Sequence, residues 1–343
     1  MAEALLGWDI GGAHLKAARV ESGRLTGAVQ IPCPLWRGLD ELDAAMNFAL
    51  ARLGKAPRHA ITMTGEMVDL FASRQQGVRA LVAAAGDRLG NAKLRVFAGE
   101  GGFVAPEQAQ KRWREIASAN WLASAMLTAA ALPEALLVDI GSTTTDVVPV
   151  AKGKVLAEGR SDSQRLARDE LVYTGIVRTP IMAVASEATF DGETQGVMAE
   201  LFATMADAYR VARILPEDAD DFPAPDQAGK TARDSARRLA RMLGRDVESA
   251  PIAAWRRFAN ELIEIQTTRI EAACRRVLKG KRLGAKAPLV AAGCGRFLVN
   301  TLARRLKRPC YDFADLVPTE KGARHSAGTC APAVAVAILA FGS

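Results

Sequence analysis

Hydrophobic and polar positions follow two periods along the chain, and these periods divide it into strands and helices. Leu5 to Ile10 is an almost uninterrupted apolar run that ends in a glycine turn, which is typical of a buried strand. His14 to Val20 and Arg24 to Ile31 have the composition of two further strands, joined by a turn at residues 21–23. The pattern therefore predicts three consecutive strands joined by two tight turns.

The same unit returns near the middle of the chain. Leu136 to Ile140 repeats the buried strand, and Thr145 to Val150 and Lys154 to Gly159 repeat the two that follow. In both copies the first strand ends in Asp-Ile-Gly, and Asp139 follows Asp9 by 130 positions. Two copies of one topology predict a duplicated α/β fold, with two related halves around a central cleft.

Segments with helical spacing lie between the predicted strands. They are Asp40 to Leu53, Gly77 to Leu89, Pro106 to Ala131, Glu193 to Leu215, Gly229 to Leu243, Ile252 to Leu278 (after Pro251), Arg296 to Leu306 and Gly328 to Phe341. A late strand is expected at Pro288 to Ala292, and the acidic, proline-containing segment 217–226 predicts an exposed loop. We expect a first domain at 1–132, a second domain with a helical insertion at 133–327, and a helix at 328–343 that returns to the first domain.

Composition narrows the class of protein without identifying it. The 343 residues are 49% hydrophobic and carry a net charge of +7. The basic residues are interspersed with acids on helical patterns and few aromatic residues accompany them, so a nucleic-acid partner is not expected. No apolar run is long enough to cross a bilayer and no signal peptide is evident. The five scattered cysteines predict reduced thiols, and together these features predict a cytoplasmic protein.

The first repeated turn has the chemistry of a phosphate loop. Asp9 ends a strand, Gly11 and Gly12 let backbone N–H groups approach a ligand closely, and Lys16 adds a positive charge. A carboxylate at this position could hold Mg²⁺ directly or through water. A single such tripeptide is more often an ordinary hairpin turn, so the interpretation depends on its being repeated.

The second turn repeats this chemistry with hydroxyl groups. Asp139 and Gly141 are followed by Ser142, Thr143 and Thr144, whose side chains can bind phosphate oxygens. Two such loops at equivalent places favour paired phosphate sites that face each other.

A third glycine turn follows the late strand. Gly293 and Gly295 could border an adenosine, or could form only a tight strand-to-helix turn, and the sequence does not decide between these readings.

The three turns together resemble the actin, hexokinase and Hsp70 superfamily, and most closely its hydantoinase A/oxoprolinase-like branch. Five further blocks, at residues 62–71, 119–124, 159–166, 170–180 and 203–210, resemble the family of tetrahydromethanopterin-linked one-carbon-transfer pathway proteins. The resemblance extends over nearly the whole chain. The first loop departs from the family pattern at His14, where asparagine is commoner.

The resemblance implies an actin/hexokinase/Hsp70-like (ribonuclease H-like) fold and a role in methanofuran biosynthesis. The implied reaction joins an aminomethylfuran-methyl diphosphate to the phenol of γ-glutamyltyramine, or of a tyrosine-based equivalent. It forms an aryl ether and releases pyrophosphate, with Mg²⁺ but without consumption of ATP. The implied partners are these small molecules, and oligomerisation is left open.

Residue roles follow from the motifs that match. Asp9 and Asp139 are the expected metal ligands, and Glu66 or Asp162 is the expected catalytic base or partner of the substrate's amine. The expected phosphate or cofactor contacts are Gly11, Gly12, Lys16, Gly141, Ser142, Thr143, Thr144, Gly293 and Gly295. The expected substrate contacts are Asn120, Arg160, Arg165, Tyr173 and Arg178, where each arginine has an alternative role in a surface ion pair.

Two other functions fit the same loops. An ATP-dependent kinase or hydantoinase/oxoprolinase-like hydrolase would bind and turn over adenine nucleotide. A non-catalytic nucleotide-binding switch would need few substrate groups, and the many polar motifs outside the loops argue against it.

Overall fold

The first half of the protein is built on a six-stranded sheet. The structure is a computed structural model that describes residues 3–90, 93–281 and 283–342, so residues 1, 2, 91, 92, 282 and 343 of the predicted units lie outside it. The strands are β1 (Ala4–Ile10), β2 (His14–Glu21), β3 (Arg24–Pro32), β4 (Arg58–Met63), β5 (Leu94–Phe97) and β6 (Phe103–Val104). Their order is β3-β2-β1-β4-β5-β6.

The second half repeats the centre of that sheet. Its strands are β7 (Glu134–Ile140), β8 (Thr145–Ala151), β9 (Lys154–Val155), β10 (Leu171–Val172), β13 (Leu289–Ala292) and β14 (Cys310–Asp312). The order is β10-β8-β7-β13-β14, and β9 pairs with β8. In each half the first strand pairs antiparallel with the second and parallel with a later strand, so the predicted duplication is confirmed. The third strand of the second unit is shorter than expected.

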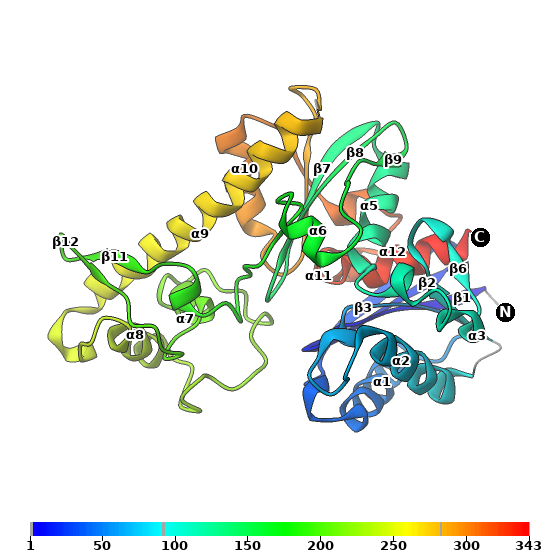
Figure 1. Ribbon diagram of the computed structural model, residues 1–343, viewed down its shortest axis with the longest axis horizontal. Coiled ribbons are helices and arrows are strands. Elements are labelled where there is room, and N and C mark those ends of the chain that lie inside the picture. Colours follow the sequence, from blue (N-terminus) through cyan, green and yellow to red (C-terminus); the bar gives the residue numbers. More distant parts are fainter. Residues whose placement is uncertain (1–2, 91–92, 282, 343) are drawn as a thin grey trace.

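Helices cover both faces of the first sheet (Figure 1). α1 (Leu39–Leu53) and α2 (Arg74–Leu89) lie on one face, where Leu6, Trp8 and Ile10 enter their core. α5 (Asn120–Ala131) and α12 (Ala331–Phe341) share the core of the opposite face. Because strand side chains alternate between faces, the continuous apolar run of β1 serves both cores.

Two long segments that were predicted as single helices are only partly helical. The segment predicted as Pro106 to Ala131 is three helices: α3 (Pro106–Ala109), α4 (Trp113–Ile116) and α5. The chain breaks at Ser118, whose φ of 50° is left-handed and incompatible with a continuous helix. The start of the segment predicted as Glu193 to Leu215 is instead a hairpin of β11 (Glu187–Phe190) and β12 (Glu193–Gly196), followed by α7 (Met205–Val211). Asp191 and Gly192, both at positive φ, form its two-residue turn.

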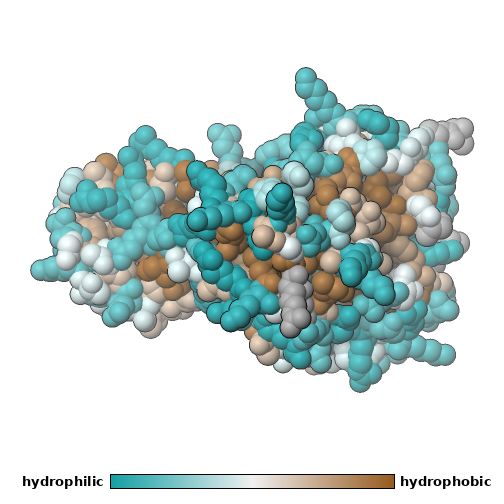
Figure 2. Space-filling model, turned by 90° about the horizontal axis from the view of Figure 1, so that it is seen from above, coloured by the Kyte–Doolittle hydropathy of each residue, from teal (hydrophilic) through white to brown (hydrophobic). Residues whose placement is uncertain are grey.

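An outer lobe extends from the second half along one long helix. α9 (Ile252–Lys281) runs from the second sheet to this lobe, where α7, α8 (Ala232–Arg241) and the β11–β12 hairpin gather (Figure 1). From above, this lobe is covered mainly by hydrophilic side chains, whereas hydrophobic ones show over the larger body (Figure 2). The lobe corresponds in position to the predicted helical insertion, although the domain limits stay a prediction.

The C-terminal segment folds back onto the first strand. The predicted helix Gly328 to Phe341 is divided at Cys330 into α11 (Arg324–Thr329) and α12. α12 packs on β1, β2 and β4, and a Cβ on Gly7 would lie 2.2 Å from the carbonyl oxygen of Ala333, so strand and helix touch backbone to backbone. Among the described residues no single helix could span a bilayer; only segments 321–329 and 331–341 together pass by length and composition, with a bend of 112°.

The remaining elements are short, apart from α10 (Phe297–Leu306), which agrees with its prediction. They are α6 (Asp162–Leu166) and the 3₁₀ turns η1 (Leu35–Arg37), η2 (Gly65–Met67), η4 (Gly99–Gly101), η5 (Ile181–Ala183), η6 (Val247–Ser249), η7 (Phe313–Leu316) and η8 (Lys321–Ala323). Two of them, η2 and α6, contribute residues to the region described next.

Candidate functional site

A cleft of about 390 Å³ lies between the two halves and is lined by both repeated loops. The predicted residues on its wall are Asp9, Gly11, Gly12, Lys16, Asn120, Asp139, Gly141, Ser142, Thr143, Thr144, Asp162, Arg165, Tyr173 and Arg178. Glu66, Arg160, Gly293 and Gly295 do not line it. The structure thus brings most of the predicted set to one place.

Each loop is closed by one backbone hydrogen bond and leaves other donors unused. The N–H of Gly11 donates to the carbonyl of His14 at 3.0 Å, and that of Gly141 donates to the carbonyl of Thr144 at 2.8 Å. Within the described ranges, the N–H groups of Gly12 and Ser142 have no acceptor. Free N–H groups in a tight turn form an anion-binding concavity.

The two loops differ in the side chain that stands opposite the aspartate. In the first hairpin Asp9 is paired in register with Lys16, and its Oδ2 lies 3.8 Å from the Lys16 Nζ. In the second hairpin Asp139 is paired in register with Asp146. The Asn120 amide, at the start of α5, lies 3.4 Å from Asp9. The first loop therefore contains its own counter-charge, whereas the second places two carboxylates side by side.

Burial and mutual repulsion raise the pKa values of these carboxyl groups. Burial raises the pKa of Asp139 to about 7, with Asp146 and Asp9 adding to the rise and Lys16 opposing it. Burial likewise raises the pKa values of Asp9 and Asp146. Burial lowers the pKa of Lys16, but the carboxylates of Asp9 and Asp139 together bring it above its ordinary value. The floor of the cleft thus disfavours further negative charge unless a cation is present.

Asp146 is a site residue that the sequence interpretation missed. It lines the cleft and is fixed by Arg165, whose Nη1 lies 2.8 Å from its Oδ1. Arg165 is fully buried, stacks on the ring of Trp121 at 3.9 Å and donates to the carbonyl of Glu170 at 2.7 Å. Arg165 lines the cleft, but its cation is already paired and positions Asp146, so its role as a substrate contact stays a prediction.

Segment 174–178 holds the second loop from behind. The N–H groups of Val177 and Arg178 both donate to the carbonyl of Ser142, at 3.1 and 2.8 Å. A Cβ on Gly175 would lie 2.4 Å from the nitrogen of Thr143, so only glycine allows this approach. Gln266 on α9 donates to the carbonyl of Gly175 at 2.9 Å and accepts from the hydroxyl of Tyr209 at 2.6 Å. Nothing in the helical pattern around Gln266 indicated this support.

Arg178 brings an available positive charge to the cleft. It is stacked over the ring of Trp36 at 5.1 Å, and no carboxylate among the described residues pairs with it. Tyr173 follows β10 on the same wall and is 60% exposed. An uncommitted guanidinium beside aromatic surface is suited to bind an anion or a carboxylate-bearing aromatic molecule.

His14, the departure in the first loop, is neutral in the structure. Burial and the nearby cations lower its pKa to about 3. Its ring meets Phe222 edge to face at 5.1 Å, and its Nε2 lies 3.8 Å from Asp221. The acidic segment 217–226 therefore reaches across to the first loop and is less exposed than predicted.

Two predicted residues lie away from the cleft wall. Arg160 is on the surface, where it pairs with Glu100 at 2.7 Å. This is the surface ion pair that was the alternative to substrate binding. Glu66, in η2, is buried behind the wall, where Arg74 and Ser118 contact it. Its prediction as a base that touches substrate directly does not fit this position.

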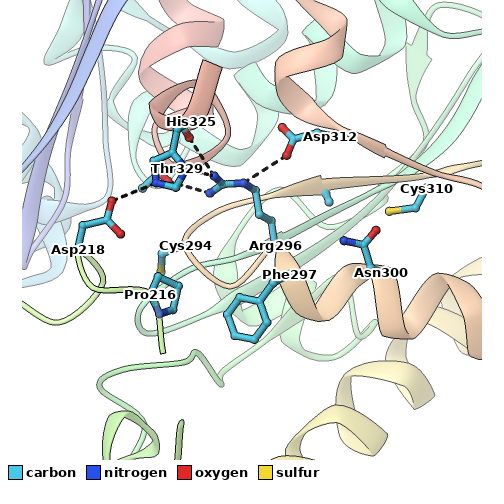
Figure 3. A pocket seen from close by; sticks show the side chains of 11 residues that line it. Pro216, Asp218, Cys294, Arg296, Phe297, Asn300, Cys310, Asp312, His325 and Thr329 are labelled. Carbon is cyan, nitrogen blue, oxygen red and sulfur yellow. Dashed lines mark hydrogen bonds and ion pairs between the residues drawn. The ribbon is translucent and has the colours of Figure 1, made fainter. Parts of the chain in front are cut away.

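A second cavity of about 280 Å³ lies behind the third glycine turn and shares Cys294 with the main cleft (Figure 3). Arg296 projects into it and donates to the Thr329 hydroxyl at 2.9 Å and to the His325 carbonyl at 3.0 Å. The N–H of Gly293 donates to the carbonyl of Gly328, and that of Gly295 to the carbonyl of Ile140. These two N–H groups are therefore used within the fold, and the structural-turn reading fits them.

A family model and two curated relatives match the chain. The model of the hydantoinase/oxoprolinase family matches residues 58–337. A protein of Methanocaldococcus jannaschii named (4-{4-[2-(gamma-L-glutamylamino)ethyl]phenoxymethyl}furan-2-yl)methanamine synthase is 33% identical over 260 residues, which cover 75% of this chain and 77% of that protein. A protein of Methanococcus vannielii with the same name is 34% identical over 112 residues, or 33% of this chain and 50% of that protein.

A solved structure shares the architecture. The nucleotide-free structure of an acetone carboxylase aligns with a TM-score of 0.55 and 12% identity, over 87% of this chain and 66% of that one. At this identity the likeness concerns the fold alone. With the repeated sheets, it agrees with the actin/hexokinase-like fold expected from the motifs.

Proposed function

The chain belongs to the hydantoinase/oxoprolinase family, and from that membership and the paired loops we propose that it is an enzyme of methanofuran-type cofactor biosynthesis. The proposed reaction joins an aminomethylfuran-methyl diphosphate to the phenol of γ-glutamyltyramine or a tyrosine-based equivalent. It forms an aryl ether and releases pyrophosphate. The observation that carries the proposal is a single cleft with two phosphate loops, in a relative of synthases whose name describes a phenoxymethyl-furan ether.

The diphosphate would lie between the loops. The free N–H groups of Gly12 and Ser142 and the hydroxyls of Thr143 and Thr144 would bind its oxygens. The ammonium group of Lys16, which now faces Asp9, would turn partly toward the diphosphate, because its flexible side chain can reach both groups. Preorganised donors of this kind stabilise negative charge that develops on a leaving group.

The donor set of the second loop fits Mg²⁺. Asp139 and Asp146 offer hard oxygen ligands, while the described residues contain no group of three or more potential ligands that could hold a metal alone. Mg²⁺ commonly takes one or two carboxylates and completes its shell with water and substrate phosphates, so such a pair is sufficient. When bound, the ion would neutralise the leaving diphosphate. Asp9, already paired with Lys16 and Asn120, would be a weaker ligand than predicted.

The rest of the wall would place the acceptor. A furan-methyl carbon can carry positive charge, so loss of the stabilised diphosphate and attack by the phenol oxygen require mainly correct orientation. Tyr173 offers aromatic surface, and Arg178, which is stacked over Trp36, could bind the carboxylate of the γ-glutamyl group. Holding both substrates in one water-poor cleft would favour ether formation over hydrolysis.

The test is a coupling assay followed by mass spectrometry. Purified protein is given Mg²⁺, the furan-methyl diphosphate and either phenolic acceptor, without ATP. Ether and pyrophosphate formed in equal amounts support the proposal and identify the acceptor. Absence of product without ATP, together with ATP binding or hydrolysis, would overturn it in favour of the kinase-like function, for which the second cavity offers room beside the cleft.

A further inference from the structure

A serine hydroxyl joins two carboxyl groups where the halves of the protein meet. The Oγ of Ser118 lies 2.9 Å from Oε1 of Glu66 and 3.1 Å from Oδ2 of Asp162. Arg74 donates to the same hydroxyl at 2.7 Å and to Glu66 at 3.0 Å. Glu66 and Ser118 come from the first half and Asp162 from α6 of the second. The cluster therefore connects the buried interior to the cleft wall, which Ser118 and Asp162 line.

The number of hydrogens in this cluster allows two arrangements. A serine hydroxyl has one hydrogen, so Ser118 can donate to Glu66 or to Asp162 but not to both. The second oxygen of Glu66, Oε2, is buried and has no partner among the described residues. A hydroxyl between two acceptors, one of them partly unsatisfied, is a geometry in which a proton can be passed on.

The backbone at Ser118 is held in an uncommon conformation. Its φ of 50° is left-handed, a region that is unfavourable for a residue with a side chain. The fold places a serine there, between α4 and α5, and the hydroxyl reaches three charged groups at once. Strained residues of this kind are concentrated at functional sites.

We propose that Asp162 accepts the phenol proton and that Ser118 and Glu66 relay it away from the cleft. This inference rests on the proposed function. As the phenol oxygen bonds to the furan-methyl carbon, the carbon–oxygen bond to the diphosphate breaks and pyrophosphate leaves with the electron pair. The phenol proton goes to the Asp162 carboxylate. Ser118 takes this proton while it gives its own hydrogen to Glu66.

The surrounding charges suit these roles. Asp162 is 22% exposed and reaches substrate, whereas Glu66 is buried and reaches it only through Ser118. Burial raises the pKa of Glu66, with Arg74 opposing the rise, so Glu66 holds a proton more readily than an exposed glutamate does. Arg74 faces both carboxyl groups, at 3.0 Å from Glu66 and 3.7 Å from Asp162.

The test compares three relay variants with one matched control. Asp162→Asn should lower kcat of the coupling reaction about 100-fold, with KM for the diphosphate within about threefold of the wild-type value. Glu66→Gln and Ser118→Gly should each lower kcat about tenfold, and glycine tolerates the left-handed backbone at residue 118. Glu100→Gln makes the same carboxylate-to-amide change in a surface pair outside the cleft and should leave kcat unchanged.

The pH profile separates a relay from structural support. Because protonated Glu66 cannot accept a second proton, wild-type kcat falls as the pH drops through its pKa. Glu66→Gln should shift this acidic limb of the kcat profile to lower pH than in Glu100→Gln. The double variant Glu66→Gln/Asp162→Asn should have a kcat little lower than that of Asp162→Asn alone. An unmoved limb, or Asp162→Asn within about threefold of wild-type kcat, would overturn the relay.

Two further measurements keep the outcomes distinct. Binding of pyrophosphate with Mg²⁺, measured by calorimetry, should be unchanged in all four variants and verifies that the cleft is folded. If the wild-type protein forms no ether at all, the proposed function fails. If it forms ether and the relay variants match the control, the relay alone fails.

Discussion

The two glycine loops that line the cleft have the same backbone pairing but residues of opposite charge at one equivalent position. Each follows a buried strand, closes with one backbone hydrogen bond and pairs its aspartate with the residue seven positions later. In the first loop that residue is Lys16, which neutralises Asp9. In the second it is Asp146, which adds a second negative charge and is itself held by Arg165. Duplication has preserved the geometry, while one side chain in each copy decides which sign of ligand the loop attracts.

This difference implies a division of labour. Under the proposed function, the first loop would present a cation to the diphosphate, and the second would present two carboxylates to a metal ion bound to the same diphosphate. Both loops are held from behind by backbone hydrogen bonds, the first through the N–H of Leu35 to the Gly12 carbonyl and the second through those of Val177 and Arg178 to the Ser142 carbonyl. The charge at the paired position is therefore the main difference between them. Substitutions should therefore have unequal effects at equivalent positions of the two loops.

The largest effect is expected from Asp139→Asn. Removal of the carboxylate should lower kcat about 1,000-fold by weakening the stabilisation of the leaving group, a loss at the upper end of those seen for such groups. The equivalent change, Asp9→Asn, should also nearly abolish turnover while preserving the fold, but with a smaller loss. Steady-state coupling rates measure both, and an effect of Asp9→Asn equal to or above that of Asp139→Asn would contradict the division of labour.

Asp139→Asn should also change how stability depends on pH. Without metal, Asp139 keeps its proton in the folded state up to about pH 7, whereas the unfolded chain releases it near pH 3.9. The folded state therefore binds more protons between these values, and stability falls as the pH rises through this window. The gain in unfolding free energy on Asp139→Asn should be about 2 kcal/mol larger at about pH 8 than at about pH 5. Denaturant unfolding in the presence of a chelator measures this difference.

The next largest effect is expected from disturbing the contact between Gly175 and the second loop. Gly175→Ala places a methyl group against the backbone of Thr143 and should lower kcat about 100-fold and stability by about 2 kcal/mol. Gly196→Ala is the matched control, because a Cβ there meets nothing within 4 Å. Assays and thermal melts of both variants provide the comparison. Equal behaviour of the two would show that loop position does not depend on this contact.

A smaller effect on turnover is expected from Lys16→Met. The first loop would lose the cation that we assign to the diphosphate, so its KM should rise about tenfold with a modest change in kcat. Calorimetry with pyrophosphate and Mg²⁺ should give the same loss of affinity. Unchanged affinity would mean that Lys16 serves only to neutralise Asp9.

The smallest effect is expected from His14→Asn. Since His14 is neutral above about pH 4, its replacement by a neutral residue should leave kcat within about threefold and the shape of the pH profile unchanged. A profile that changes between about pH 5 and pH 8 would show that this histidine titrates during turnover.

The duplicated core could be predicted because its signal is local. A buried strand, an Asp-Ile-Gly turn and a second strand occur within a dozen residues, and two copies confirm each other. Asp146 carried the same signal, since it occupies the position of Lys16 in the second copy, but the change of charge obscured it. The Asp191–Gly192 turn was also visible and should have outweighed the helical spacing that follows it.

Other features depend on contacts that no local pattern carries. Ser118 interrupts a stretch with good helical spacing. No proline or glycine stands at this position to mark the break. Arg160 and Arg165 lie five residues apart in similar polar surroundings, yet one is on the surface and the other is the buried partner of Asp146. Which arginine enters the interior is decided by Trp121 and Asp146, both distant in sequence.

The packing of α12 on β1 has a consequence for how the chain acquires its structure. Gly7 and Ala333 are in backbone contact although more than 300 residues separate them, and α12 shares the cover of one face of the first sheet with α5, so this cover is incomplete until α12 is present. During synthesis, the strand that precedes the first loop therefore gains its full packing only after α12 has been made. Contacts of such high sequence separation slow folding and lengthen the exposure of an apolar strand to aggregation. Removal of α12 should therefore lower the refolding yield, and it would also remove Pro332 from the wall of the cleft.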